Sequence, residues 1–244
     1  MSMIPEKPPF KLLDILYKKE FILFVVLVSI LIINSNISPY FLDLYNLIDS
    51  TFLFSEKAII ALTMTFVIIA RQIDLSVASI IAVSSCVLGY TTSLGYDTWL
   101  VISLTLLSGA LCGAFNGAII TKFAIPSIIV TIGTMSLFRG LAYSFLEDSY
   151  YNKFPKLVSN LGGGYLFGYI PYAFLSFIIL AIIFAFILHK TSVGKKIYSI
   201  GNNPDAAQYT GIAVDKYTFV LFTLNGLFSA LAAIFLSGRL SSVR

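Results

Sequence analysis

Long apolar stretches recur from residue 21 to the C-terminus, and they constrain the fold of this chain more than any other feature. A bilayer core about 30 Å thick needs roughly 20 mostly apolar residues per helix. Stretches such as 21–33 and 172–188 have no polar face, which argues against a soluble helical protein with a large core. Only 11% of the 244 residues are charged, too few for a water-soluble surface. We therefore predict an all-α fold, a polytopic transmembrane helical bundle.

Hydropathy predicts about seven spans, near residues 20–36, 57–73, 75–93, 99–121, 127–146, 171–189 and 217–237. Only Arg71 and Asp74 interrupt the region 57–93, which therefore contains either two spans or a broken helix. Segment 37–55 is typical of an amphipathic stretch at the outer membrane surface. No small-residue cleavage site follows the first apolar run, so we expect an uncleaved first helix.

The distribution of basic residues predicts a cytoplasmic N-terminus. This orientation divides the chain into a cytoplasmic segment 1–19 and a transmembrane domain 20–244, with a cytoplasmic loop 190–216 and an outer loop 147–170. It places ten basic residues inside and five outside, with Arg139 within a span: Lys7, Lys11, Lys18, Lys19, Arg71, Lys122, Lys190, Lys195, Lys196 and Lys216 inside, and Lys57, Lys153, Lys156, Arg239 and Arg244 outside. Basic residues spread over short loops do not indicate nucleic-acid binding.

Residues that could perform bond chemistry are scarce. The only histidine, His189, lies beside Lys190 at the end of a span, and one histidine supports neither a metal site nor a catalytic triad. No G-x-x-x-x-G-K-[ST] sequence occurs, so we do not expect the chain to bind or hydrolyse ATP. We predict no catalytic residue, no metal site and no cofactor on this chain.

The segment IGNNPDAAQYTGI at 200–212 predicts a short helix with both ends specified. Asn203 can cap its amino end, and Pro204 suits the first helical position. Asp205 adds negative charge in the first turn, while Gly211 tolerates the left-handed stop. Because so short a helix is marginal alone in water, it either packs against another surface or serves as a self-contained turn between spans.

This segment resembles the coupling loop of monosaccharide-type ABC importer permeases, the family of ribose, xylose, rhamnose and autoinducer-2 transporters. Its G-x-N-P-x-A-A-x-x-x-G-I pattern is matched by Gly201, Asn203, Pro204, Asp205, Ala206, Ala207, Gly211 and Ile212. The resemblance implies that the short helix docks on a cytoplasmic ATPase and transmits the nucleotide cycle to the spans.

Two further blocks resemble the same family, ARQIDLSVAS at 70–79 and FNGAIITKFAIPSIIVTIGT at 115–134. Charges near mid-membrane are costly, so Arg71 and Asp74 are expected to avoid lipid and, three residues apart on one helix face, to pair. A charged turn at the membrane edge is the alternative. In the next span Gly109, Gly113 and Gly117 repeat every four residues, which favours close helix packing.

Hydroxyl and amide side chains suggest a path for a neutral polyol. Ser127, Thr131 and Thr134 share one face of the fifth span, although such hydroxyls often bond to their own helix carbonyls. The candidate path residues are Asp74, Ser76, Asn116, Thr131, Thr134 and Arg139.

The resemblance implies a permease subunit of an ATP-driven importer for a sugar or sugar-like solute in a bacterial inner membrane. Its expected partners are cytoplasmic ATPases that carry ATP and Mg, a second permease subunit forming a homo- or heterodimer, and an external solute-binding protein. An ion-gradient-driven secondary transporter is the alternative. Family members are usually longer, so the chain is expected to be truncated at its C-terminus. At Arg71-Gln72 the chain resembles rhamnose and autoinducer-2 permeases, and this resemblance implies a deoxy-sugar or a small furanosyl compound as solute.

Overall fold

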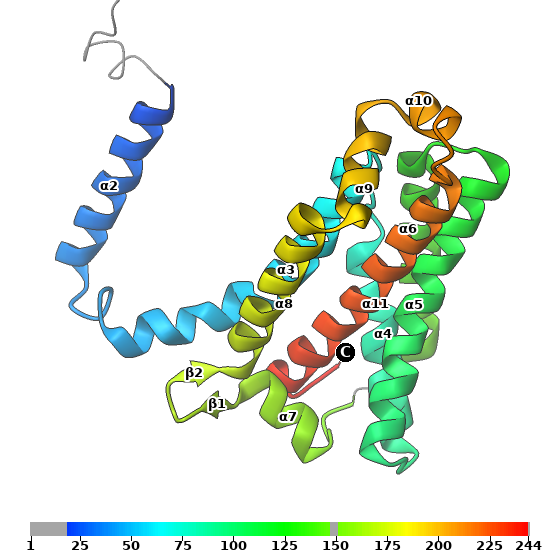
Figure 1. Ribbon diagram of the computed structural model, residues 1–244. Coiled ribbons are helices and arrows are strands. Elements are labelled where there is room, and N and C mark those ends of the chain that lie inside the picture. The colour runs from blue at the N-terminus through cyan, green and yellow to red at the C-terminus, as the bar shows by residue number, and fades with distance from the viewer. Residues whose placement is uncertain (1–18, 147–150, 244) are drawn as a thin grey trace, which may run out of the picture. The chain divides into compact units, whose positions relative to one another are not determined.

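The computed structural model describes residues 19–146 and 151–243, and helices account for most of them (Figure 1). The helices are α2 (Lys19–Ile37), α3 (Leu44–Ile69), α4 (Val77–Ser93), α5 (Thr98–Phe123), α6 (Ser127–Leu146), α7 (Lys156–Gly163), α8 (Tyr172–Lys190), α9 (Ser192–Asn202), α10 (Pro204–Tyr209) and α11 (Val214–Leu240). Strands β1 (Tyr165–Leu166) and β2 (Ile170–Pro171) form a small antiparallel pair.

Among the described residues, five helices are long and apolar enough to cross a bilayer: α3, α5, α6, α8 and α11. Two shorter apolar helices, Phe21–Ile37 and Val77–Ser93, occupy the positions of the first and third predicted spans. The all-α, polytopic prediction is confirmed. The cytoplasmic N-terminus stays a prediction, and residues 1–18 and 147–150 of the predicted terminal segment and outer loop lie outside the described part of the chain.

The chain divides into two compact units, Met1–Leu47 and Ile48–Arg244. Helix α2 of the first unit is apolar around its circumference, with side chains such as Leu23 and Ile32 more than half exposed within that unit. A helix apolar on every face is suited to a hydrocarbon environment rather than to water.

The second unit is organised by the contact of α5 with α11. A Cβ atom on Gly109 would overlap the carbonyl oxygen of Gly226, and one on Gly113 would overlap that of Phe222. Gly117 continues this face against the backbone of Phe219. Because small residues let backbones approach, these glycines lie where the two helices touch.

The longer apolar helices of the second unit, α3, α4, α5, α6, α8 and α11, run in alternating directions (Figure 1). Helices α9 and α10 lie at the end of the unit where α3, α5 and α8 finish, and α7 with β1 and β2 lies at the opposite end. The two ends therefore carry different structures.

One expectation about segment boundaries was wrong. The second span begins at Leu44 rather than near residue 57, so most of the stretch 37–55 assigned to the membrane surface belongs to a spanning-length helix. The segment 147–170, predicted as an outer loop, contains α7, whose Gly162 packs against the backbone of Gly238 and Arg239. Hydropathy missed α7 because it is short and its neighbours are distant in sequence.

Candidate functional site

The segment between α3 and α4, residues 70–76, is irregular and partly buried, with Arg71, Ile73 and Leu75 exposed. Helix α3 ends at Ile69, and Arg71 then adopts a left-handed conformation with φ of 60°. Ala70, Asp74 and Ser76 are at most 2% exposed. In region 57–93, α3 and α4 are thus separate helices, joined by the non-helical residues 70–76 before α4 begins at Val77.

The carboxylate of Asp74 is the centre of a buried hydrogen-bond network. Its Oδ1 accepts bonds from the backbone N–H of Ser76 at 2.9 Å and the Ser76 hydroxyl at 2.6 Å. Its Oδ2 accepts from the side-chain amide of Asn225 on α11 at 2.8 Å. Asn225 Oδ1 accepts from Thr63 Oγ1 of α3 at 2.7 Å, so the network joins segment 70–76 to two spans.

Asn116 of α5 extends this network. Its Nδ2 donates to Ser76 Oγ at 2.8 Å, and its Oδ1 is buried without a hydrogen-bond partner. Asn116 lies seven residues before the end of α5, about 10 Å at a rise of 1.5 Å per residue, which places the network within the length of the spans. Leaving a buried carbonyl oxygen without a partner costs about 1–3 kcal/mol. The Oδ1 atom of Asn116 can therefore still accept a hydrogen bond from another group.

The hydroxyls of α6 hold segment 70–76 from the other side. The Ser127 hydroxyl accepts a bond from the backbone N–H of Ile73 at 3.0 Å, and Thr131 Oγ1 lies 3.3 Å from the Ile73 carbonyl. Thr131 also donates to the Ser127 carbonyl at 2.8 Å, and Thr134 lies one turn further along the same buried face. The stripe predicted from the sequence therefore faces a backbone segment.

One expectation about charges was wrong. Arg71 and Asp74 are not on one helix face, because residues 70–76 are not helical, and Arg71 is exposed while Asp74 bonds to Ser76 and Asn225. Arg139 is exposed on α6, and its place among the path candidates stays a prediction. Sequence reasoning missed Asn225 and Thr63, whose only signal was a polar side chain inside an apolar span.

The segment 200–212 forms a protruding turn, which we call the knob and define as Asn203–Gly211. Asn203 Oδ1 accepts a bond from the Ala206 N–H at 3.1 Å, and Pro204 occupies the first position of α10. Gly211 has φ of 86°, in the left-handed region. Asp205 is exposed, and Tyr209 is 93% exposed. The six-residue helix thus presents a charge and an aromatic ring outward.

The inner side of the knob contacts the end of α3. Ala207 belongs to a buried apolar cluster with Phe66, Val67 and Ile197. A Cβ on Gly201 would overlap the carbonyl oxygen of Ile69, the residue directly before segment 70–76. The knob and the Asp74 network are therefore linked through backbone contact at Gly201 and Ile69.

One ion pair occurs among the described residues, and the sequence gave no signal for it. Arg239 of α11 contacts both carboxylate oxygens of Glu56 on α3, at 2.8 and 3.2 Å. Within the same described ranges, no three His, Cys, Asp or Glu side chains are grouped as metal ligands would be. The hydrogen bonds and the ion pair thus connect α3, α5, α6 and α11 to one another and to segment 70–76.

The comparisons identify the family. Residues 46–244 match the permease components of branched-chain amino acid transport systems. The chain belongs to this family, and it is the permease subunit of an ABC-type import system and a multi-pass inner-membrane protein.

Three curated relatives are similar over most of the chain. The ribose import permease protein RbsC of Haemophilus influenzae is 35% identical over 228 residues, which is 91% of this chain and 69% of the relative. The corresponding protein of Bacillus subtilis is 36% identical over 226 residues, again 91% and 69%. The autoinducer 2 import system permease protein LsrD of Klebsiella pneumoniae is 33% identical over 239 residues, 92% and 69%. No solved structure matches the chain significantly.

Proposed function

We propose that this chain carries a ribose-like sugar, or a sugar-like solute of the autoinducer-2 class, across the membrane under the control of a separate ATPase. The proposal is supported by similarity to ribose and autoinducer 2 import permeases at 33–36% identity. The family's description mentions branched-chain amino acids, but the amides and hydroxyls around Asp74 are chemically better suited to a polyol.

The observation that carries the coupling mechanism is the backbone contact of Gly201 with Ile69. An ATPase that binds the exposed Asp205 side of the knob would displace α10 and α9 together. The Gly201 backbone lies directly against the Ile69 carbonyl, with no flexible side chain between them. The displacement would therefore pass to the end of α3 and to segment 70–76. The Asp74 bonds to Asn225 and Ser76 would then break or re-form as the spans change their tilt.

The proposed coupling surface consists of Gly201, Asn203, Pro204, Asp205, Ala206, Ala207 and Gly211. The partners follow from that role. ATP and Mg would bind to the cytoplasmic ATPase subunits, so loop 190–216 would be cytoplasmic. A second permease subunit would complete the pathway, and an external solute-binding protein would deliver the solute.

For the solute path we propose Asp74, Ser76, Asn116, Thr131 and Thr134, with the unused acceptor of Asn116 as the first contact for a solute hydroxyl. The path is closed in this conformation, because all five residues are at most 5% exposed. Opening would require segment 70–76 to separate from α6.

The coupling proposal is tested by reversing one charge on the knob. Asp205→Lys, assayed in vesicles with the ATPase and the solute-binding protein, should lower ATP-driven ribose uptake by at least about tenfold, since like charges at an interface cost several kcal/mol and about 1.4 kcal/mol already corresponds to a factor of ten. Pro204→Gly should also lower uptake, because it loosens the first turn of α10. Basal ATP hydrolysis and membrane insertion should persist in both variants.

Exposed Lys195→Glu, a charge reversal outside the knob, is the matched control and should keep most of the uptake. Unchanged uptake by Asp205→Lys would refute the coupling role. Uptake that follows an ion gradient without ATP would instead support the secondary-transporter alternative.

A further inference from the structure

A groove of about 650 Å³ opens in the second unit between α8 and α11, with α3 and α9 completing its walls. Its lining is mostly apolar and aromatic. The rings of Phe66, Phe184 and Phe228 line it and contact one another, with centroid separations of 5.2 Å and 5.1 Å from Phe184 to the other two. The groove is therefore walled by side chains that would favour hydrocarbon over water.

The groove starts at the end of the spans and extends about as deep as one leaflet. Lys196 of α9 and Lys216, in the first turn of α11, line one end. The deepest lining residue of α8, Leu180, lies ten residues before the end of that helix, about 15 Å at a rise of 1.5 Å per residue. Half of a hydrocarbon core of about 30 Å has the same depth.

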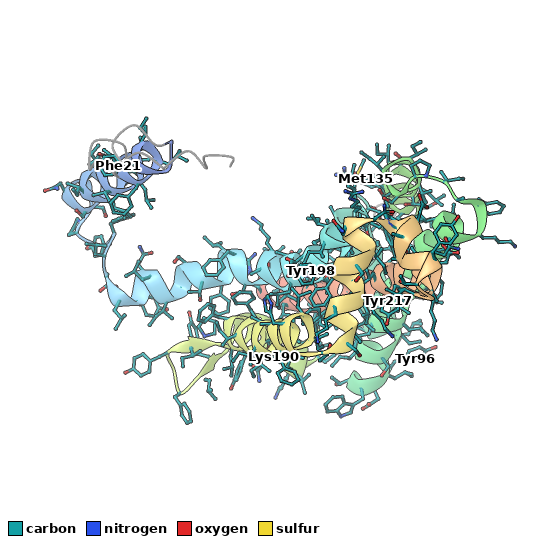
Figure 2. The ribbon with its side chains drawn as sticks, turned by 45° about the horizontal axis from the view of Figure 1, so that its top comes forward. Phe21, Tyr96, Met135, Lys190, Tyr198 and Tyr217 are labelled. Atoms are coloured by element: carbon teal, nitrogen blue, oxygen red, sulfur yellow. The ribbon has the colours of Figure 1, made fainter. Side chains whose placement is uncertain are left out.

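Charge is concentrated at the end of the groove where α8 ends and α11 begins. Within the part of the chain that the structure describes, the lining contains two lysines and no carboxylate. Lys196 Nζ lies 5.9 Å from the centre of the Tyr217 ring, which Figure 2 labels on α11. Asp215 precedes Lys216 in the chain but does not line the groove. The end at the surface is therefore suited to an anion.

We propose that this groove binds one phospholipid with an anionic headgroup. Its phosphate would lie between Lys196 and Lys216, and an acyl chain would pack against the three phenylalanine rings. Basic pockets between spans at a membrane surface select anionic lipids, because each lysine or arginine near the surface attracts the negative headgroup. Helix α8 supports a lipid as the occupant, since only 11% of its most apolar window is buried inside the protein.

The test uses the full chain in nanodiscs of equal phosphatidylglycerol and phosphatidylcholine, with the retained lipid identified by native mass spectrometry. The wild type should retain phosphatidylglycerol preferentially. The double variant Lys196→Gln and Lys216→Gln should lose roughly 30-fold of that preference, about fivefold per lysine. Exposed Lys195→Gln, on the same helix but outside the lining, should keep it.

Two further outcomes decide the identity of the occupant. A photoreactive residue at Val220, within the groove, should cross-link to phospholipid. A cross-link to protein, including a second copy of this chain, would overturn the proposal. So would equal retention of both lipids by the wild type, or a double variant with unchanged preference.

Discussion

The knob and segment 70–76 are both short connections between helices, but their hydrogen bonds differ in reach. In the knob, Asn203 bonds to Ala206 three residues away, and Ile212 N–H donates to the Ala207 carbonyl. In segment 70–76, Asp74 bonds to Asn225, 151 residues away. The knob is thus specified by its own sequence, whereas segment 70–76 is specified by the spans around it.

This difference bears on how each region can function. A turn whose hydrogen bonds are all local can be bound by a partner and moved as a rigid body. Most of its residues can remain exposed. A partly buried segment that is hydrogen-bonded to three different helices, α5, α6 and α11, can move only when those helices move. The contact of Gly201 with Ile69 lies between the two kinds of structure.

The largest expected effect is the loss of the Asp74 carboxylate. Asp74→Ala leaves two Ser76 donors and the Asn225 amide without their acceptor in a buried setting. We expect a loss of about 3 kcal/mol in the free energy of unfolding, at about 1–3 kcal/mol per unsatisfied buried group. Reversible unfolding in mixed micelles, followed by circular dichroism, measures this difference.

Asp205→Ala provides the matched control, because Asp205 is exposed on the knob. Its free energy of unfolding should stay within about 0.5 kcal/mol of the wild type. Equal losses in the two variants would remove the distinction between the regions.

A smaller effect is expected at the contact of α5 with α11, which also joins residues distant in sequence. Gly113→Ala would place a methyl group against the Phe222 carbonyl and should cost about 2 kcal/mol, within the usual range for overpacking. Gly133→Ala on α6 is the control, since no neighbouring atom lies within 4 Å of its added Cβ. There the helix propensity of alanine should stabilise the protein by up to about 1 kcal/mol. Unfolding in mixed micelles measures both variants. Destabilisation of the same size at both glycines would contradict the packing role of Gly113.

The same contrast explains what could be predicted from sequence. The spans followed from hydropathy, and the cap, proline and glycine of α10 followed from rules that act within one turn. These features depend on residues close together in the chain. The all-α fold and the shape of the knob were therefore accessible without a structure.

The Asp74 network was only partly accessible. Asp74, Ser76 and Asn116 stood out as polar residues inside apolar stretches, but Asn225 was not connected to them because nothing in the sequence relates positions 151 residues apart. The supposed Arg71–Asp74 pair failed because it assumed a continuous helix. Helix α9 was missed because its short pattern of buried residues, Gly194, Ile197 and Ile200, follows immediately after a span.

The smallest expected effect lies in the knob and is confined to it. Asn203→Ala removes the side-chain acceptor of the Ala206 N–H and should cost α10 about 1 kcal/mol. Hydrogen–deuterium exchange of the amides in 204–211 should therefore quicken about fivefold, while the unfolding midpoint of the whole protein stays unchanged. Asn202→Ala, one residue earlier and outside the cap, should leave exchange as in the wild type. If Asn203→Ala instead lowered the midpoint as Asp74→Ala is expected to do, the knob would depend on the spans as strongly as segment 70–76 does, and it could not move as a separate body.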